Sequence, residues 1–422
     1  MSERIYIVNA RRLPVCKSKG EKIPPEEGGN GIDRYPGKYE SLGSVELLSC
    51  VLEDLVKNTS IPKEDISDII TGCALQDSDQ GANVARIAQL TLDLPQEIPA
   101  VTVDRLCGSS LSATMKAAEF LIAGQNFKDE KPRAVLVGGI EHMGHHDMSE
   151  IFSPSKYFYD NFAQKNITAL NMGLTAEKLA EMFKISRTEQ EVFAYHSHTK
   201  AVKAASEGKF DDEIIPVTLP DGEILKNDVG PRTYGSLEEA LKTFSRLKPA
   251  FKNGGTVTAA TSAPYSDGAA GLFVVTESYM NLKKLKPMAE IISWSSTGVD
   301  PNIMGFGPVE STKTALKRAG LYLKDIGLIE MNEAFCAQIL ACIKQLSRDF
   351  DLDEKEFNKI INVNGGATAL GHPLGATGAK LLTTMVHELQ RRPDVEYGLV
   401  TMCIGMGQGD AMILKNINGG LY

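Results

Sequence analysis

The fold is decided by a stretch that occurs twice, KEDISDIITGC at residues 63–73 and LKDIGLIEMNE at residues 323–333. Two more apolar segments recur in the same order at nearly the same offset. They are PAVTV at 99–103 with IINV at 360–363, and AVLVGG at 134–139 with GLVTM at 398–402. Near-continuous apolar runs are typical of strands buried on both faces. Chance similarity between α/β segments is the alternative, but three ordered matches favour a duplicated α/β fold.

A stretch without a counterpart separates the two halves. It contains helical patterns such as AEKLAEM at 176–182, joined by polar connections. The apolar run GLFVV at 271–275 then returns the chain to the first half. We therefore predict three parts, and insertions on one face of a sheet often build a ligand site. They are an N-terminal half of residues 1–136 plus 264–284, an inserted domain of residues 137–263 and a C-terminal half of residues 285–422.

The composition excludes several classes of protein. The 422 residues suffice for two or three domains. Lys and Arg number 45 against 54 Asp and Glu, and this net charge of −9 argues against nucleic-acid binding. No apolar run reaches the roughly 18 residues of a membrane span, and IYIVNA at 5–10 does not resemble a signal peptide. Seven scattered cysteines without a CxxC pair indicate reduced thiols, so we expect a cytoplasmic protein.

Four segments at predicted strand ends carry the residues that could do chemistry. Ligands of open α/β sheets bind at such places. The segments are LCGSSL at 106–111 with Cys107, EMNEAF at 330–335 with Asn332, GHPLGATG at 371–378 with His372, and MCIGMGQG at 402–409 with Cys403. Taken singly, each residue has an ordinary structural explanation, namely a buried cysteine, a structural histidine or a helix cap.

The surroundings of these residues indicate their chemistry. Cys107 precedes a predicted helix, whose dipole favours a thiolate. His372 precedes Pro373, a residue suited to the first turn of a helix, in a Gly-rich turn that we expect to face solvent. The glycines after Cys403 resemble a dinucleotide loop, but DAMIL at 410–414 reads as a strand where such a fingerprint needs a helix. These glycines instead allow backbone N–H groups to point at a ligand, as in an oxyanion hole.

Together these groups suit carbon–carbon bond chemistry on thioesters. A thiolate can carry an acyl group. A second thiol of near-neutral pKa can exchange a proton with the carbon next to a carbonyl. A histidine and a water held by an asparagine can stabilise the resulting enolate.

In their order and spacing, the four motifs resemble the thiolase family. Two further segments, GIEHM at 139–143 and NGGA at 364–367, are also similar. The resemblance runs from Ile5 to Leu414 and is nearest to the degradative branch, including the bacterial type that forms the β-subunit of a fatty acid oxidation complex. It implies two mixed five-stranded halves in αβαβα layers, with an inserted loop domain that binds coenzyme A.

The resemblance also implies an activity and a role for each residue. The activity is CoA-dependent cleavage of 3-ketoacyl-CoA in β-oxidation, with coenzyme A as substrate and no permanently bound cofactor. Cys107 would take the acyl group, and His372 would activate it. Asn332 would hold a water that stabilises the enolate oxygen together with His372. Cys403 would move a proton on the acetyl-CoA methyl carbon, and the N–H groups of Cys107 and Gly405 would form the second oxyanion hole.

Members of the family form dimers or tetramers, so the resemblance implies a homo-oligomeric core. In the degradative branch it also implies a hetero-oligomer with a multifunctional β-oxidation α-subunit.

Departures from the family pattern affect the expected coenzyme A contacts. Ala263 stands where many thiolases carry a Ser or Thr that contacts pantetheine, so Ser262 is an alternative contact. Arg232 lies in the region where the family places a cation near the nucleotide end of coenzyme A. Asn171 stands where biosynthetic thiolases carry a histidine, which argues against acetoacetyl-CoA synthesis. Residues 18–39 are rich in Gly, Pro and charge, and we expect an extended surface loop there.

Other features admit simpler explanations. His142, His145 and His146 could bind zinc, but the family has no metal at the equivalent stretch, so we predict no metal site. His196 and His198 do not share a helical face, and we expect both at the surface. An aromatic group in the insertion would form core packing, cover an acyl chain or make a membrane-facing contact. Its members are Phe152, Tyr157, Phe158, Tyr159 and Phe162.

Three other functions compete with the degradative thiolase. Condensing enzymes that act on carrier-protein thioesters lack a second catalytic cysteine, so Cys403 argues against them. The others are an acetoacetyl-CoA thiolase of biosynthetic type and an inactive CoA- or lipid-binding protein with the same fold. The presence of all four catalytic residue types argues against the inactive protein.

Overall fold

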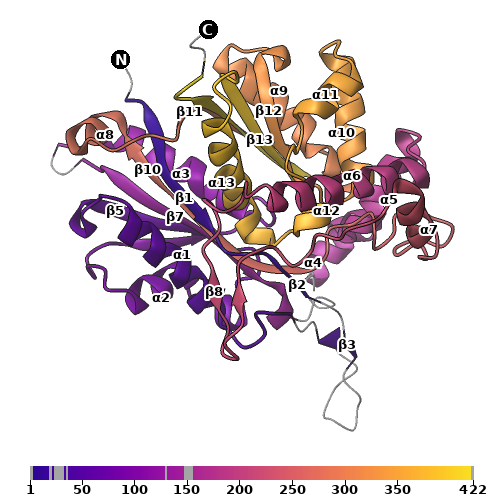
Figure 1. The fold of residues 1–422 in the computed structure, drawn as a ribbon, viewed down its shortest axis with the longest axis horizontal. Helices are drawn as coiled ribbons and strands as arrows, with labels where there is room; N and C mark the ends of the chain where they lie inside the picture. Colours follow the sequence, from indigo (N-terminus) through magenta and orange to yellow (C-terminus); the bar gives the residue numbers. More distant parts are fainter. Residues whose placement is uncertain are drawn as a thin grey trace.

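One long mixed sheet runs through the molecule, with helices on both faces (Figure 1). The computed structural model describes residues 3–18, 21–22, 33–34, 37–128, 131–146 and 155–419. In spatial order the strands are β12 (Ile326–Met331), β13 (Tyr397–Ile404), β14 (Gln408–Asn416), β11 (Ala289–Gly298), β1 (Ile5–Arg12), β10 (Ser266–Thr276), β7 (Ala134–His142), β5 (Ile66–Gly72) and β6 (Ala100–Val103), with β2 (Cys16–Lys17) paired to β10.

The two ends of this sheet repeat each other, which confirms the predicted duplication. On one side β10 pairs antiparallel with β7, β7 pairs parallel with β5, and β5 pairs parallel with β6. On the other side β14 pairs antiparallel with β13, and β13 pairs parallel with β12. The counterpart of β6 is reduced to a single parallel bridge between Ile329 and Ile361. The halves join where Ile5–Ile7 of β1 pair antiparallel with residues 289–291 of β11.

Alternation along the strands explains why their sequences are apolar almost throughout. Successive side chains of a strand point to opposite faces of its sheet. In β7, Val135 faces the central core and Leu136 faces an outer core. In β13, Val400 faces the same central core and Leu399 faces the other outer core. Both faces of each half are therefore covered, which produces the predicted αβαβα layers.

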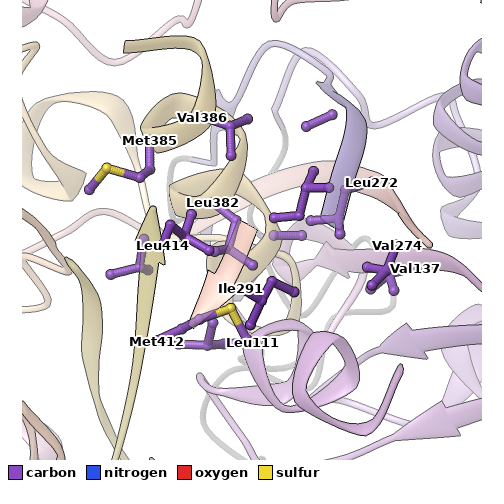
Figure 2. Close-up of a cluster of buried hydrophobic side chains, with 14 of the residues drawn as sticks. Leu111, Val137, Leu272, Val274, Ile291, Leu382, Met385, Val386, Met412 and Leu414 are labelled. Carbon is purple, nitrogen blue, oxygen red and sulfur yellow. The ribbon is translucent and has the colours of Figure 1, made fainter. Parts of the chain in front are cut away.

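Two helices, one from each half, form the central layer. They are α3 (Ser109–Gly124) and α13 (Thr377–Gln390). Figure 2 shows Leu382 and Met385 of α13 with Leu111 of α3 in one apolar cluster. A Cβ at Gly378 would lie 2.3 Å from the backbone nitrogen of Leu111, so only glycine allows the helices to approach this closely. Burial of this cluster is the main apolar contribution that holds the halves together.

The outer layers and the connecting segments contain the other helices. The N-terminal half carries α1 (Ser44–Asn58), α2 (Val84–Thr91) and α8 (Glu277–Lys283). The C-terminal half carries α9 (Gly307–Ala319), α10 (Cys336–Asp349), α11 (Glu354–Ile360) and α12 (Ala367–Leu370). The insertion contains α4 (Lys156–Phe158), a π-helical turn (Tyr159–Ala163), α5 (Met172–Met182), α6 (Arg187–Ser206), β8 (Val217–Thr218), β9 (Ile224–Leu225) and α7 (Leu237–Phe244). Among the described helices, none is both long and apolar enough to cross a membrane.

Two details refine the sequence-based prediction. The predicted start of the insertion, residue 137, falls within β7, and we propose to move this boundary to the end of that strand at His142. In the predicted loop at 18–39, β3 (Glu21–Lys22) and β4 (Asp33–Arg34) form a short antiparallel pair. The predicted loop therefore contains one short stretch of regular pairing. Residues 19–20, 23–32 and 35–36 lie outside the described residues.

Candidate active site

Cys107 lies in a tight turn between β6 and α3. Its predecessor Leu106 has φ +47°, a left-handed conformation that costs a non-glycine residue about 1 kcal/mol or more. A Cβ at Gly108 would lie 2.3 Å from Cδ1 of Ile404, so glycine is needed where this turn meets β13. Packing against the second half therefore holds the Cys107 turn in place.

Two opposing effects act on the Cys107 sulfur. Burial raises the pKa of the thiol to about 11, whereas hydrogen bonds from the backbone N–H groups of Gly405 and of Cys107 itself lower it. The sequence indicated that the helix N-terminus favours a thiolate here, but the raised pKa shows that burial keeps the thiol protonated. The two N–H groups that converge on this sulfur are those expected to form the second oxyanion hole.

Cys403 is the second thiol of the site and is fully buried on β13. Burial and then the neighbouring Cys107 raise its pKa well above the usual range. The prediction of a near-neutral pKa is therefore wrong for this structure. Apolar side chains surround Cys403, among them Met172 and Phe335. The Cys403 thiol is thus protonated, and Cys107 lies close enough to raise its pKa further.

Asn332 and His372 form a second pair of candidate site residues. Asn332 follows β12, and its backbone N–H donates to the carbonyl of Thr401 on β13 at 3.0 Å. Nδ2 of Asn332 lies 3.3 Å from Nε2 of His372. Both residues are buried, so the expected solvent-facing position of His372 is wrong. Oδ1 of Asn332 is buried and has no partner among the described residues, which leaves one acceptor free to hold a water.

Thr377 determines which nitrogen of His372 carries the proton. Its hydroxyl donates to the carbonyl of Pro373 at 2.7 Å. Because that hydroxyl has only one hydrogen, it can only accept at His372 Nδ1, 2.6 Å away. Nδ1 is therefore protonated, and Nε2 is the free base that accepts from Asn332. Burial and then the charge of Lys380 lower the pKa of His372 to about 3, so the imidazole is neutral at physiological pH.

Backbone contacts fix the turn that carries His372. Its N–H donates to Oγ of Ser266 on β10 at 3.0 Å. Three residues later in the same loop, the N–H of Gly375 donates to the buried carboxylate of Glu141 at 2.7 Å. Glu141 is the second-last residue of β7 and also accepts from the N–H of Ala74 at 3.0 Å. One carboxylate of the N-terminal half thus positions the histidine loop of the C-terminal half.

A second buried carboxylate, Glu333, fixes Asn332 beside it. It accepts from Nδ2 of Asn362 at 2.8 Å, from Oγ of Ser197 at 2.7 Å and from the N–H of Thr368 at 3.1 Å. These partners come from the C-terminal half and from helix α6 of the insertion. The EMNEAF segment, the NGGA loop and the insertion are therefore joined at one point next to the site.

The three residues expected to bind coenzyme A lie in different surroundings. The backbone N–H of Ala263 donates to the carbonyl of Ala334 at 3.0 Å, and Ser262 forms a β-bridge with Phe335. Since Phe335 also packs on Cys403, both residues lie beside the cysteine site. Arg232 is exposed, and its backbone N–H donates to Nδ1 of His198 at 3.2 Å. No contact among the described residues joins the Arg232 guanidinium to the cysteines.

The remaining histidines each have a structural role. His142, His145 and His146 pair separately with Asp267, Asp79 and Asp77. The described residues contain no group of three His, Cys, Asp or Glu side chains that could hold a metal. His196 is exposed as expected, but the surface position predicted for His198 is wrong. His198 packs under the segment of Arg232, and burial lowers its pKa to about 4.

The aromatic group of the insertion lies partly at the surface. Tyr157 is 78% exposed and Tyr159 is 43% exposed, so core packing is the wrong explanation for these two rings. Phe158 and Phe162 contact each other with ring centroids 5.2 Å apart. Phe152 lies outside the described residues. The two tyrosines therefore leave an apolar surface on α4 and the turn that follows it.

Comparison with known proteins agrees with this geometry. The model of the thiolase N-terminal domain matches residues 31–278, and that of the thiolase C-terminal domain matches residues 285–416. The chain belongs to the thiolase family. A 3-ketoacyl-CoA thiolase of Escherichia coli O139:H28 is 42% identical over 417 residues, which cover 98% of this chain and 100% of the relative. The same identity and coverage hold for a 3-ketoacyl-CoA thiolase of Escherichia fergusonii.

Solved thiolase structures superpose over almost the whole chain. Human mitochondrial 3-ketoacyl-CoA thiolase in complex with CoA has a TM-score of 0.80 and 31% identity, covering 98% of each chain. The acetyl-CoA acetyltransferase of Bacillus anthracis has a TM-score of 0.81 and 31% identity, covering 99% of each chain. This thiolase therefore shares its complete architecture with enzymes that carry either name.

Sequence reasoning missed several residues that position the site. Thr377, Ser266 and Glu141 all bond to the His372 loop, yet each looks like an ordinary polar residue in the sequence. Thr377 alone carried a usable signal, since it lies five residues after His372 at the start of a predicted helix. The contacts of Ser266 and Glu141 come from other strands, so no local pattern reveals them.

Thr377→Val should slow acylation of Cys107 by about a hundredfold. The change removes the acceptor for His372 Nδ1–H and favours the tautomer whose Nε2 carries the proton and cannot accept one. The measurement is single-turnover acylation by an acyl-CoA, followed by mass spectrometry of the Cys107 peptide. Thr377→Ser keeps the hydroxyl and should retain most of the rate. Wild-type acylation in Thr377→Val would contradict this role.

Proposed function

We propose that this chain cleaves 3-ketoacyl-CoA with free coenzyme A, yielding acetyl-CoA and a shortened acyl-CoA in fatty acid β-oxidation. The observation that carries the proposal is the pair of free thiols, Cys107 and Cys403, on two segments that meet where Gly108 packs against Ile404. One thiol can then carry the acyl group while the other handles a proton on carbon. Identity of 42% over the whole length of named 3-ketoacyl-CoA thiolases supports this activity.

In the first half-reaction, His372 Nε2 takes the proton of Cys107 as its sulfur attacks the C3 carbonyl. The N–H groups of Cys107 and Gly405 stabilise the oxyanion, which then collapses with rupture of the C2–C3 bond. The electron pair enters an enolate of acetyl-CoA, whose oxygen His372 and a water on Asn332 stabilise. Cys403 donates its proton to C2 and releases acetyl-CoA. The raised pKa of Cys403 keeps its thiol protonated, as this step requires.

In the second half-reaction, the Cys403 thiolate takes the proton of an incoming coenzyme A thiol. The coenzyme A sulfur attacks the acyl group on Cys107. The thioester bond between the acyl group and the Cys107 sulfur then breaks. The protonated His372 returns its proton to the Cys107 sulfur, and the shortened acyl-CoA leaves. Both thiols and the neutral imidazole are then restored. Coenzyme A acts as a substrate, with Ser262 and Ala263 beside the reacting end and Arg232 near the nucleotide end.

Two observations bear on the competing functions. Cys403 lies next to Cys107, which supports a thiolase over a carrier-protein condensing enzyme with one catalytic cysteine. Asn171 accepts from the N–H groups of Gly173 and Leu174 and so caps helix α5. Its amide oxygen is thereby occupied, which supports a degradative rather than an acetoacetyl-CoA-forming enzyme. All seven cysteines lie in described segments and are free, as expected for a cytoplasmic protein.

Cleavage of 3-ketoacyl-CoA substrates of increasing chain length tests the function. We expect CoA-dependent turnover, with medium or long chains preferred over the four-carbon substrate. Cys107→Ala should abolish turnover while thermal unfolding stays close to wild type. Absence of turnover on every chain length would refute the proposal, and a preference for the four-carbon substrate would favour the biosynthetic type.

Cys403→Ala should separate the two thiol roles. Acyl-CoA should still acylate Cys107, although more slowly, because Cys403 serves that step only by protonating the coenzyme A thiolate, which is a good leaving group without it. Deuterium exchange at the acetyl-CoA methyl should be lost, because no other thiol can move that proton. Peptide mass spectrometry and proton NMR provide the two measurements. Exchange at the wild-type rate would show that Cys403 is not the base, and acylation found on Cys403 of the wild type would reverse the assignment.

We further propose that the protein forms a homo-oligomeric core. Strand β6 lies at the edge of the sheet, and no described strand pairs with its outer side. Its Val101 is 44% exposed, and Leu90 on the adjacent helix α2 is 53% exposed. An exposed apolar edge strand favours pairing with another chain. A dimer or a tetramer would cover this edge.

A second partner is proposed for the insertion. A thiolase gains effective substrate concentration when the enzyme that makes its 3-ketoacyl-CoA is bound nearby. The exposed Tyr157 and Tyr159 offer an apolar docking surface for a multifunctional β-oxidation α-subunit. Affinity capture from the native host followed by light scattering should recover this hetero-oligomer, and Tyr157→Ser/Tyr159→Ser should weaken it without loss of turnover. Recovery of only a homodimer or homotetramer would refute this partner.

A further inference from the structure

A buried lysine lies behind the histidine of the site. Lys380 is on the first turn of α13 and is 3% exposed. Its Nζ donates to the carbonyl of Gly371 at 3.2 Å, the residue directly before His372. Gly371 has φ +94°, and a Cβ there would lie 2.6 Å from Cγ1 of Val15. The turn that presents His372 is therefore held from behind by an ammonium group.

Lys380 belongs to a buried cluster of charges that the proposed reaction does not use. Nε of Arg12 bonds to Glu213 at 2.6 Å, and its other nitrogens bond to Asp228 at 2.7 and 2.9 Å. Burial and then the charge of Arg12 lower the pKa of Lys380, whereas the carboxylates of Asp228 and Glu213 oppose this shift and favour the charged form. Burial raises the pKa of Glu330 well above its usual range, so this neighbour is neutral. The two cations are thus balanced by two anions.

The positive and negative charges of this cluster make different contacts, and only a positive group bonds to the turn that carries His372. The carboxylates contact Arg12, whereas the ammonium group bonds to the backbone of the histidine turn. After burial, the charge of Lys380 is the cause that lowers the pKa of His372. The titratable and charged groups that face this cluster from the elements packed around it are Arg12 on β1, Lys200 on α6, Glu213 and Asp228 of the insertion, Glu330 and Glu333 at the end of β12, and His387 and Glu388 on α13.

We propose that Lys380 is a positioning residue for His372, whose ammonium group both holds the Gly371 carbonyl and opposes protonation of the imidazole. A neutral imidazole with a free Nε2 is what the thiol of Cys107 needs as its base, so this inference rests on the proposed function. Burial alone would also favour the neutral form, but it would not hold the turn. The ammonium group provides both effects from one position.

Three variants separate the charge from the hydrogen bond. Lys380→Arg keeps both, Lys380→Gln keeps a donor without charge, and Lys380→Met removes both. Imidazole NMR of the full-length protein from about pH 4 to 8, with the His372 signal assigned by His372→Asn, reads the charge state without any substrate. Glu330→Gln is the matched control, because it changes a neutral side chain of the same cluster.

The wild type and Lys380→Arg should keep His372 neutral over the whole range. Lys380→Gln and Lys380→Met should raise the pKa of His372 from about 3 by about one unit or more, so that its imidazole becomes partly protonated at the acidic end of the range, where the wild type stays neutral. In thiolysis assays Lys380→Met should lower kcat with little change in KM, and Lys380→Arg should restore it. If Lys380→Met does not fold, the charge-balanced double variant Lys380→Met/Glu213→Gln replaces it.

Two results would overturn the inference. One is a His372 titration that stays at its wild-type position in both neutral variants. The other is an equal shift in Glu330→Gln, which would assign the effect to general loosening of the cluster. Wild-type inactivity toward 3-ketoacyl-CoA would refute the proposed function instead, and the NMR titration would still decide the role of Lys380.

Discussion

The close packing of α3 against α13 is the constraint on which the site depends. Each helix follows one of two candidate site residues, since α3 begins two residues after Cys107 and α13 begins five residues after His372. Because the halves are copies of one architecture, the two helices are equivalent elements, and their N-terminal ends face a common region. Any change that separates Gly378 from the backbone of Leu111 would also separate the two loops. The packing of α3 against α13 therefore also brings the two loops of the site together.

The duplication explains why the two halves share one architecture. Their residues differ, however, at the ends of equivalent strands. Asn332 follows β12 where Gly72 ends β5, and Cys403 lies on β13 where the equivalent part of β7 has Gly139 and Ile140. A Cβ at Gly72 would lie 2.1 Å from the backbone nitrogen of Ser110. The first half therefore uses small residues to admit the start of its own helix α3. The second half uses the matching positions for chemistry.

The sequence predicted the layers and the duplication, because strands buried on both faces leave strong local patterns. It did not predict the ionisation of Cys107, Cys403 or His372. A helix dipole can be read from the order of residues, but burial depends on what the other half contributes. Glu141 and Ser266 were missed for the same reason, since they act across the boundary between halves. His198 was misplaced because the segment that covers it, around Arg232, is distant in the sequence.

The position of β1 has a consequence for the synthesis of the chain. This strand is made before its neighbours in the sheet, β10 and β11, which begin at residues 266 and 289. Until more than half of the polypeptide has left the ribosome, β1 has neither partner and exposes two unpaired edges. Pairing over such a sequence separation is slow to form, and unpaired apolar strands aggregate. The nascent chain therefore depends on protection of β1 from aggregation until β10 and β11 have been made.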